Sequence, residues 1–154
     1  MLHLAPSTIQ AYMELAFDRM SGALDRLDDE KVNARPAGWG TNSVAGLIVH
    51  CCELSVFWRS GPGLGRESPR DRDAEFVAVA TVAELRHRLD HAREVLEPLI
   101  EEFCDGPTAG DHPLRAFLPG ADTSDAALVI HIFEELFQHI GHIEVTADAL
   151  TSTP

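Results

Sequence analysis

Four long stretches of the sequence repeat apolar residues at three- and four-residue steps, and none keeps the two-residue alternation of a strand. They run from about Ser7 to Leu27, Ser43 to Arg59, Thr81 to Phe103 and Asp122 to Leu150. A helix with one apolar stripe becomes stable by packing that stripe against other helices. The sequence therefore predicts an all-α four-helix bundle with two long connecting loops, and we expect residues 1–154 to form a single domain.

Local signals mark where these helices begin and end. Pro6 and Ser7 stand where a first helix is expected to start, and Thr81-Val-Ala-Glu84 has the form of a capping box for the third helix. Gly61-Pro-Gly-Leu-Gly65 is a strong stop after the second helix. Pro98 lies inside the third helix and removes one backbone hydrogen bond, so we expect a kink or a break near Glu94.

The charge of the chain excludes several classes of partner. Twenty-five acidic residues against twelve Lys and Arg give a net charge of −13, and protonation of all eight histidines would still leave −13 + 8 = −5. Nucleic acids and anionic membranes bind clustered cations, so neither is expected as a partner. No apolar stretch approaches the roughly 20 residues of a transmembrane helix, and the N-terminus lacks the features of a signal peptide. We therefore expect a cytoplasmic protein.

The cysteines are Cys51, Cys52 and Cys104, an odd number with two neighbours. Adjacent cysteines in a helix do not readily form a disulfide, so buried and reduced thiols are the expectation. A thiolate metal ligand is the alternative, because two of the cysteines follow His50. Cys51 and Cys52 lie ~100° and ~200° around a helix from His50, which argues against it.

The last helix carries a stripe of polar side chains beside its apolar residues. His131, Glu135, His139 and His142 fall within ~80° of arc at about 100° per residue, so all four project to one side. A polar group buried without a partner costs about 1–3 kcal/mol, so these groups are expected to be hydrogen-bonded or bound to a ligand. The alternative is ordinary partly buried polar residues, with His131 and His142 facing solvent.

The second helix contributes His50, which stands in an otherwise apolar run, with Glu53 on the same face. Two imidazoles and one carboxylate leave a divalent ion with a net charge of about +1 and open positions, as in a catalytic site. The zincin motif is excluded because no His directly precedes Glu135. A di-iron bundle is excluded because position 138 is Gln, which breaks the Glu-x-x-His pattern.

Two stretches resemble the DinB-like superfamily. They are Ser43-Val-Ala-Gly-Leu-Ile-Val-His50, followed by Glu53 and Trp58, and Val129-Ile-His-Ile-Phe-Glu-Glu135-Leu-Phe-Gln-His139-Ile-Gly-His142. The likeness is greater to the branch of mycothiol-dependent maleylpyruvate isomerase and the mycothiol S-transferases. It implies a four-helix bundle of DinB-like topology with metal ligands at His50, Glu135 and His139. The ion implied is divalent, with zinc the first expectation and nickel, iron and manganese the alternatives.

The resemblance also implies a reaction, in which the ion activates a low-molecular-weight thiol such as mycothiol for attack on a small-molecule electrophile, by transfer or by isomerisation. His142 is the candidate catalytic residue, which would receive the thiol proton or bind the thiol cofactor, and Glu53 is a candidate acceptor for the second ring nitrogen of a metal-ligating imidazole. The segment Arg70 to Glu75 is a candidate for the mouth of the pocket.

Three alternatives to this reaction remain open. They are a metal-dependent hydrolase, a metal-binding or stress-response module without turnover that acts as a homodimer, and a bundle without metal.

Overall fold

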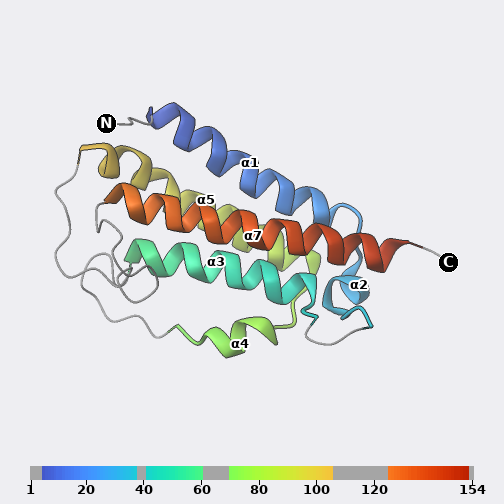
Figure 1. Ribbon diagram of the computed structural model, residues 1–154. Coiled ribbons are helices and arrows are strands. Elements are labelled where there is room, and N and C mark those ends of the chain that lie inside the picture. The colour runs from blue at the N-terminus through green and yellow to red at the C-terminus, as the bar shows by residue number, and fades with distance from the viewer. Residues whose placement is uncertain (1–4, 38–40, 61–69, 106–124, 153–154) are drawn as a thin grey trace.

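The computed structural model describes residues 5–37, 41–60, 70–105 and 125–152, without the side chains of 59–60, 99–105 and 125–126. Its helices are α1 (Pro6–Leu24), α2 (Asp29–Asn33), α3 (Val44–Ser60), α4 (Arg72–Phe76), α5 (Val82–Asp105) and α7 (Asp125–Thr151) (Figure 1). No strand occurs within these ranges. The predicted all-α class is confirmed, and the four long helices match the four periodic stretches.

The four long helices form a ring in which each packs mainly on two others. α1 and α3 each contact both α5 and α7, so α1 lies diagonally across from α3 (Figure 1). The short helix α4 packs along the outside of α3. This arrangement puts α3 between α7 on one side and α4 on another, and the candidate metal centre lies at that junction.

The core fills the inside of this ring with aliphatic side chains, methionines and Phe17. From Ser43, just before α3, to Cys52 the chain is buried on every side, because this first half of α3 is covered by α2, α4, α5 and α7. A helix covered in this way has to be apolar all round, as this segment is apart from His50 and Ser43. The burial of His50 is therefore a consequence of its place in the bundle.

The start and stop signals have mixed outcomes. α1 begins at Pro6, and Thr81 and Glu84 form the predicted capping box, with Thr81 N–H donating to Glu84 Oε2 at 2.8 Å. The same hydrogen bond lowers the pKa of Glu84. Of the two outcomes expected near Glu94, a kink or a break, the break does not occur: α5 continues through Pro98, because a helix held by α1 and α3 tolerates one lost hydrogen bond. The residues before Asp125, where we expected the last helix to start, lie outside the described part.

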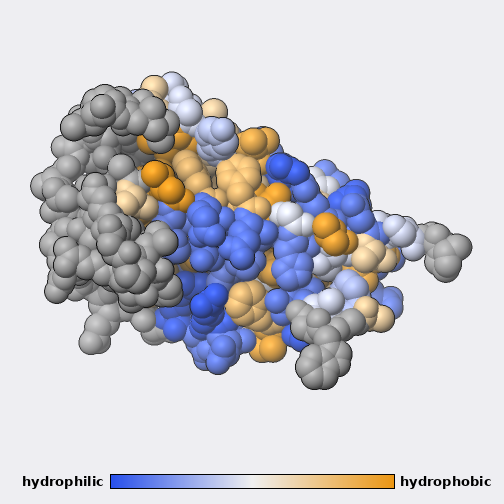
Figure 2. All heavy atoms as spheres, in the orientation of Figure 1, coloured by the Kyte–Doolittle hydropathy of each residue, from blue (hydrophilic) through white to orange (hydrophobic). Residues whose placement is uncertain are grey.

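The surface combines charged pairs with one apolar groove. Ion pairs join neighbouring helices, such as Arg19 to Glu144 at 2.6 Å, but exposed pairs contribute little stability. Figure 2 shows hydrophobic side chains gathered where α1 meets the first half of α7. The groove there measures about 230 Å³ and is lined by Thr8, Ile9, Tyr12, Ile130, Phe133 and Phe137. None of the described helices is both long and apolar enough to span a membrane.

Candidate metal centre

His50 lies on α3 and is held from one side by α4. Its side chain is only 1% exposed, and its Nδ1 lies 2.8 Å from Oε2 of Glu75. Glu75 is itself 4% exposed. Arg70 compensates the buried carboxylate with two hydrogen bonds, from Nε to Oε1 at 2.6 Å and from Nη2 to Oε2 at 2.9 Å. The three side chains form a chain from the arginine through the carboxylate to the imidazole.

These contacts determine which nitrogen of His50 carries the proton. An ionised carboxylate only accepts hydrogen bonds, so Nδ1 must donate to Glu75. Arg70 Nη2 also lies 3.2 Å from Nδ1, but two donors do not bond to each other, and Arg70 already donates to Glu75. In the neutral ring the lone pair is therefore on Nε2, the nitrogen that points away from α4. A carboxylate behind an imidazole in this way is typical of metal-ligating histidines.

Glu135 and His139 approach His50 from α7. Oε2 of Glu135 lies 3.8 Å from Nε2 of His50 and 3.5 Å from Nε2 of His139. One ligand atom from each of the three residues falls within 4.8 Å of the others. Two donors bound to one ion at about 2.1 Å in tetrahedral geometry are about 3.4 Å apart, which is close to both distances. The three predicted ligands are thus brought together, and the cluster could hold a metal ion.

The cluster contains a buried atom that lacks a protein partner. Nε2 of His50 is inaccessible to solvent and makes no hydrogen bond. An unpaired buried polar atom costs about 1–3 kcal/mol, and a metal ion is one group that would compensate it. Burial is also the main cause that lowers the pKa of His50, and it lowers that of His139 to about 4. Both rings are therefore neutral at pH 7, which is the form that binds metal.

Packing fixes the orientation of the His50 ring. Phe76 of α4 stacks on it with 4.4 Å between ring centroids and 24° between planes. His139 meets it edge-on, with the centroids 4.5 Å apart. His50 thus has one hydrogen bond and two ring contacts that hold it, and its free nitrogen is directed at α7. Such preorganisation lowers the entropic cost of binding a ligand.

The expectation for Glu53 is wrong. This side chain is outside the cluster and pairs with Arg88 of α5 at 3.2 Å, with 42% of it exposed to solvent. The carboxylate that pairs with the His50 imidazole is that of Glu75. Glu75 could not be singled out from sequence, since it is 25 residues from His50 and follows two other acids, Asp71 and Asp73, in a short charged segment. Asp71, which caps α4 by accepting from Ala74 N–H at 3.0 Å, was the one local sign of a helix there.

The segment Arg70 to Glu75 does lie at the site, as a wall against His50. Most of it is the N-terminal part of helix α4. Arg70 lies over the ring of Phe57 at 5.3 Å while it pairs with Glu75. This segment therefore supports the side chain of His50 from the α4 side.

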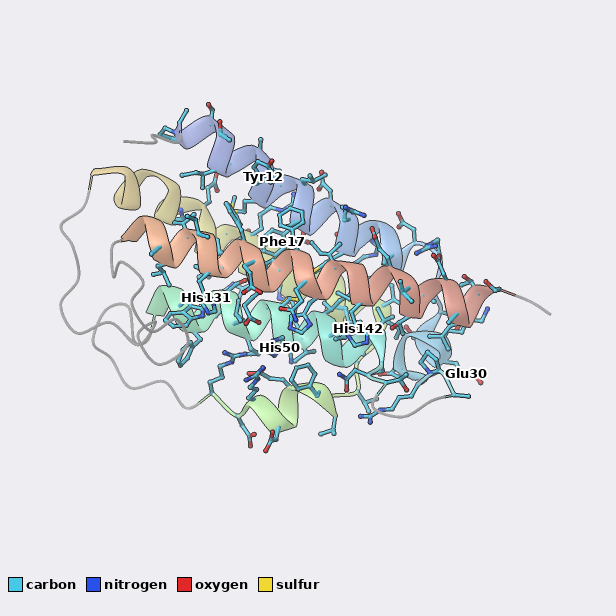
Figure 3. All side chains as sticks on the ribbon, in the orientation of Figure 1. Tyr12, Phe17, Glu30, His50, His131 and His142 are labelled. Atoms are coloured by element: carbon cyan, nitrogen blue, oxygen red, sulfur yellow. The ribbon has the colours of Figure 1, made fainter. Side chains whose placement is uncertain are left out.

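The other two histidines of the stripe differ in their surroundings. In Figure 3, His131, His50 and His142 follow one another along the line where α7 meets α3. His142 is half buried and contributes to the lowered pKa of His139, but it is outside the three-residue cluster. His131 is 8% exposed and lies edge-on to Trp58 at 5.2 Å. The alternative in which His131 faces solvent is therefore wrong.

The thiols of Cys51 and Cys52 are buried, free and outside the cluster. Burial raises the pKa of Cys51 and raises that of Cys52 to about 12, so both remain protonated. The expectation of buried, reduced thiols is confirmed for these two. Neither contributes a donor to the cluster, which removes the support for a thiolate ligand. The side chain of Cys104 lies outside the described residues.

The fold and the cluster together place the protein in one class: helical bundles in which a His/Glu/His group between two helices could hold a divalent ion. Comparison with protein families is more specific: the profile of the DinB superfamily matches residues 12–143. The chain belongs to the DinB superfamily. Comparison with curated proteins and with solved structures finds no match.

Proposed function

We propose that this chain is a thiol transferase in which one divalent ion, held by His50, Glu135 and His139, activates a low-molecular-weight thiol. The observation that carries the proposal is the unpaired Nε2 of His50, directed at Glu135 while Glu75 occupies the other nitrogen. Zinc is the ion we propose, because nitrogen and carboxylate donors at an open site suit it.

The number of metal-ligand atoms in the cluster supports a catalytic metal site over a closed structural one. Among the described residues the cluster offers three ligand atoms, and four are usual for structural zinc. Three protein ligands leave a position for a reacting molecule. A metal-binding module without turnover would need a fourth ligand, and among the residues that the structure describes neither His142 nor Cys51 nor Cys52 belongs to the cluster.

A divalent ion in this place would supply one chemical effect, a lowered pKa for a thiol that binds beside it. The protein's own residues would supply the rest. Glu75 and Arg70 keep the His50 proton on Nδ1. His142, one turn beyond His139 on α7, would accept the thiol proton. The sulfur would then form a bond to an electrophilic carbon. In a substitution, the leaving group on that carbon departs with its electron pair. In an addition, the neighbouring carbon takes up a proton instead.

Thiol consumption tests this function directly. The zinc-loaded protein is incubated with a haloalkane or an epoxide and with mycothiol, bacillithiol or glutathione in turn, and free thiol is measured over time. We expect at least one thiol to be consumed faster than with metal-free protein. Equal rates with and without zinc for all three thiols would contradict the proposal. Release of acid from esters or amides under the same conditions would favour a hydrolase.

Metal analysis tests the ligands separately from the reaction. Protein purified without an affinity tag is expected to retain zinc, and His50→Ala is expected to lose it. His142→Gln should keep the zinc but slow thiol consumption, because it removes only the proton acceptor. An unchanged zinc content in His50→Ala would show that the ligand set is wrong. An unchanged rate in His142→Gln would remove that residue from the reaction.

A further inference from the structure

The carboxylate of Glu135 belongs to two groups of metal-ligand atoms. Besides the group with His50 and His139, it forms a second one with His131 and Glu134, again with one atom of each residue within 4.8 Å of the others. His131, Glu135 and His139 follow one another at four-residue steps along α7, so the two groups lie on either side of Glu135. A carboxylate has two oxygens and can bind a different ion with each.

We propose that the chain binds a second divalent ion at His131 and Glu134, and that Glu135 bridges this ion to the one held by His50 and His139. The inference rests on the proposed metal centre, because Glu135 is shared. It adds a second metal-binding site and makes the centre dinuclear.

The position of His131 supports the second metal-binding site. The ring is nine-tenths buried and is held edge-on against Trp58, so its orientation is restricted. Its Nδ1 lies 3.7 Å from Oε2 of Glu134. That separation exceeds a normal hydrogen bond and is near the about 3.4 Å expected between two donors to one tetrahedral ion. The donor–donor distances in the first group, 3.5 and 3.8 Å, are of the same size.

Exposure and charge indicate which ion binds more weakly. Glu134 is 57% exposed, so the second ion would lie at the solvent side of the centre. The charge of Glu75 is neutralised by Arg70, which leaves Glu134 and Glu135 to balance the ions. One ion with Glu135 gives +2 − 1 = +1, and two ions with both carboxylates give +4 − 2 = +2. The second ion therefore binds less tightly, and an anionic substrate or a thiolate would strengthen its binding.

A count of bound zinc has to exclude one unrelated pair of ligands. His87 and His91 are exposed and stand four residues apart on α5, a spacing that allows two imidazoles to chelate an ion. The parent for the test is therefore His87→Gln/His91→Gln. Both side chains lie on the surface of α5, so their replacement should leave the fold intact.

The test is equilibrium dialysis of the parent against Zn²⁺, with bound metal determined by elemental analysis. We expect two zinc ions per chain, the second binding more weakly, and one per chain after Glu134→Gln or His131→Gln. Zinc X-ray absorption of the fully loaded parent should show a second zinc at about 3.5–4 Å, absent in both variants. If His131→Gln fails to fold, the exposed Glu134→Gln variant decides the matter.

The outcomes separate this inference from the proposed function. One zinc per chain in the parent, unchanged by Glu134→Gln, would overturn the second metal-binding site and leave the first metal-binding site, that of His50, Glu135 and His139, intact. Two zinc ions that persist in both variants would also overturn it. No bound zinc at all would contradict the proposed metal centre together with the second metal-binding site.

Discussion

The carboxylate of Glu75 is a costly group to bury, and its contacts indicate what it does. An unpaired buried charge is strongly unfavourable, and Arg70 compensates this carboxylate with two hydrogen bonds. The remaining acceptor capacity is directed at Nδ1 of His50. Replacement of a buried ion pair by apolar residues is often neutral for stability. We therefore interpret the Arg70–Glu75 pair as a means of positioning His50 rather than of stabilising the fold.

Substitution of Glu75 tests that interpretation. Glu75→Gln keeps the shape of the side chain but removes the charge that fixes the proton on Nδ1 of His50 and pairs with Arg70. Loss of a group that orients a metal ligand typically lowers metal affinity 10- to 100-fold, and we expect a decrease of about that size for zinc, measured by competition with a chromophoric chelator. Glu53→Gln is the matched control, since its ion pair with Arg88 is exposed, and its affinity should stay unchanged. Equal affinities in the two variants would contradict a role for Glu75.

At the scale of elements, the close contact between α3 and α4 depends on Gly46. A Cβ on this residue would lie 2.8 Å from the backbone oxygen of Phe76 and 3.1 Å from its carbonyl carbon, and backbone atoms have little freedom to move aside. The absence of a side chain at Gly46 therefore lets α4 lie close enough to α3 for Glu75 and Phe76 to reach His50. One glycine on α3 thus sets the position of the whole short helix.

Gly46→Ala is accordingly expected to displace α4. We expect a loss of about 1–3 kcal/mol in the free energy of unfolding, measured by urea denaturation, and weaker zinc binding. Gly22→Ala is the control: a Cβ there meets no other atom within 4 Å, in the last turn of α1, so the free energy of unfolding should not fall and the zinc affinity should stay unchanged. If Gly46→Ala is as stable and binds zinc as well as Gly22→Ala, the close contact has no such role.

The long helices could be predicted from sequence and the short ones could not, for a physical reason. Periodicity needs several turns to become visible, and Asp29–Asn33 and Arg72–Phe76 have little more than one turn each. The convergence of His50, Glu135 and His139 was predicted because the resemblance assigned the pairing of helices. The contact of His50 with Glu75 was missed, since it depends on how a five-residue helix docks, which is a property of packing at Gly46.

At the scale of the whole molecule, burial makes the two imidazoles of the centre sensitive to acid. The pKa of His139 is lowered from 6.5 to about 4, mainly by burial and then by the charge of His50, and the pKa of His50 is lowered mainly by burial. The unfolded chain exposes both rings, which then take up protons near pH 6.5. Between about pH 6.5 and 4 the unfolded state therefore binds more protons than the folded state.

We expect the metal-free protein to lose stability as the pH falls through this window, because protons favour the state that binds more of them. Urea denaturation at pH 7.5, 5.5 and 4.5, with a chelator present, measures the loss. Carboxylates such as Glu84, whose pKa is lowered in the fold, add a loss in the same direction at the acid end. His139→Gln separates the two effects: it removes one buried imidazole and keeps the carboxylates, so its stability should fall less between pH 7.5 and 4.5. Parallel losses in the two proteins would show that His139 binds protons equally well in the folded and unfolded chain, and that burial at the centre does not suppress its ionisation.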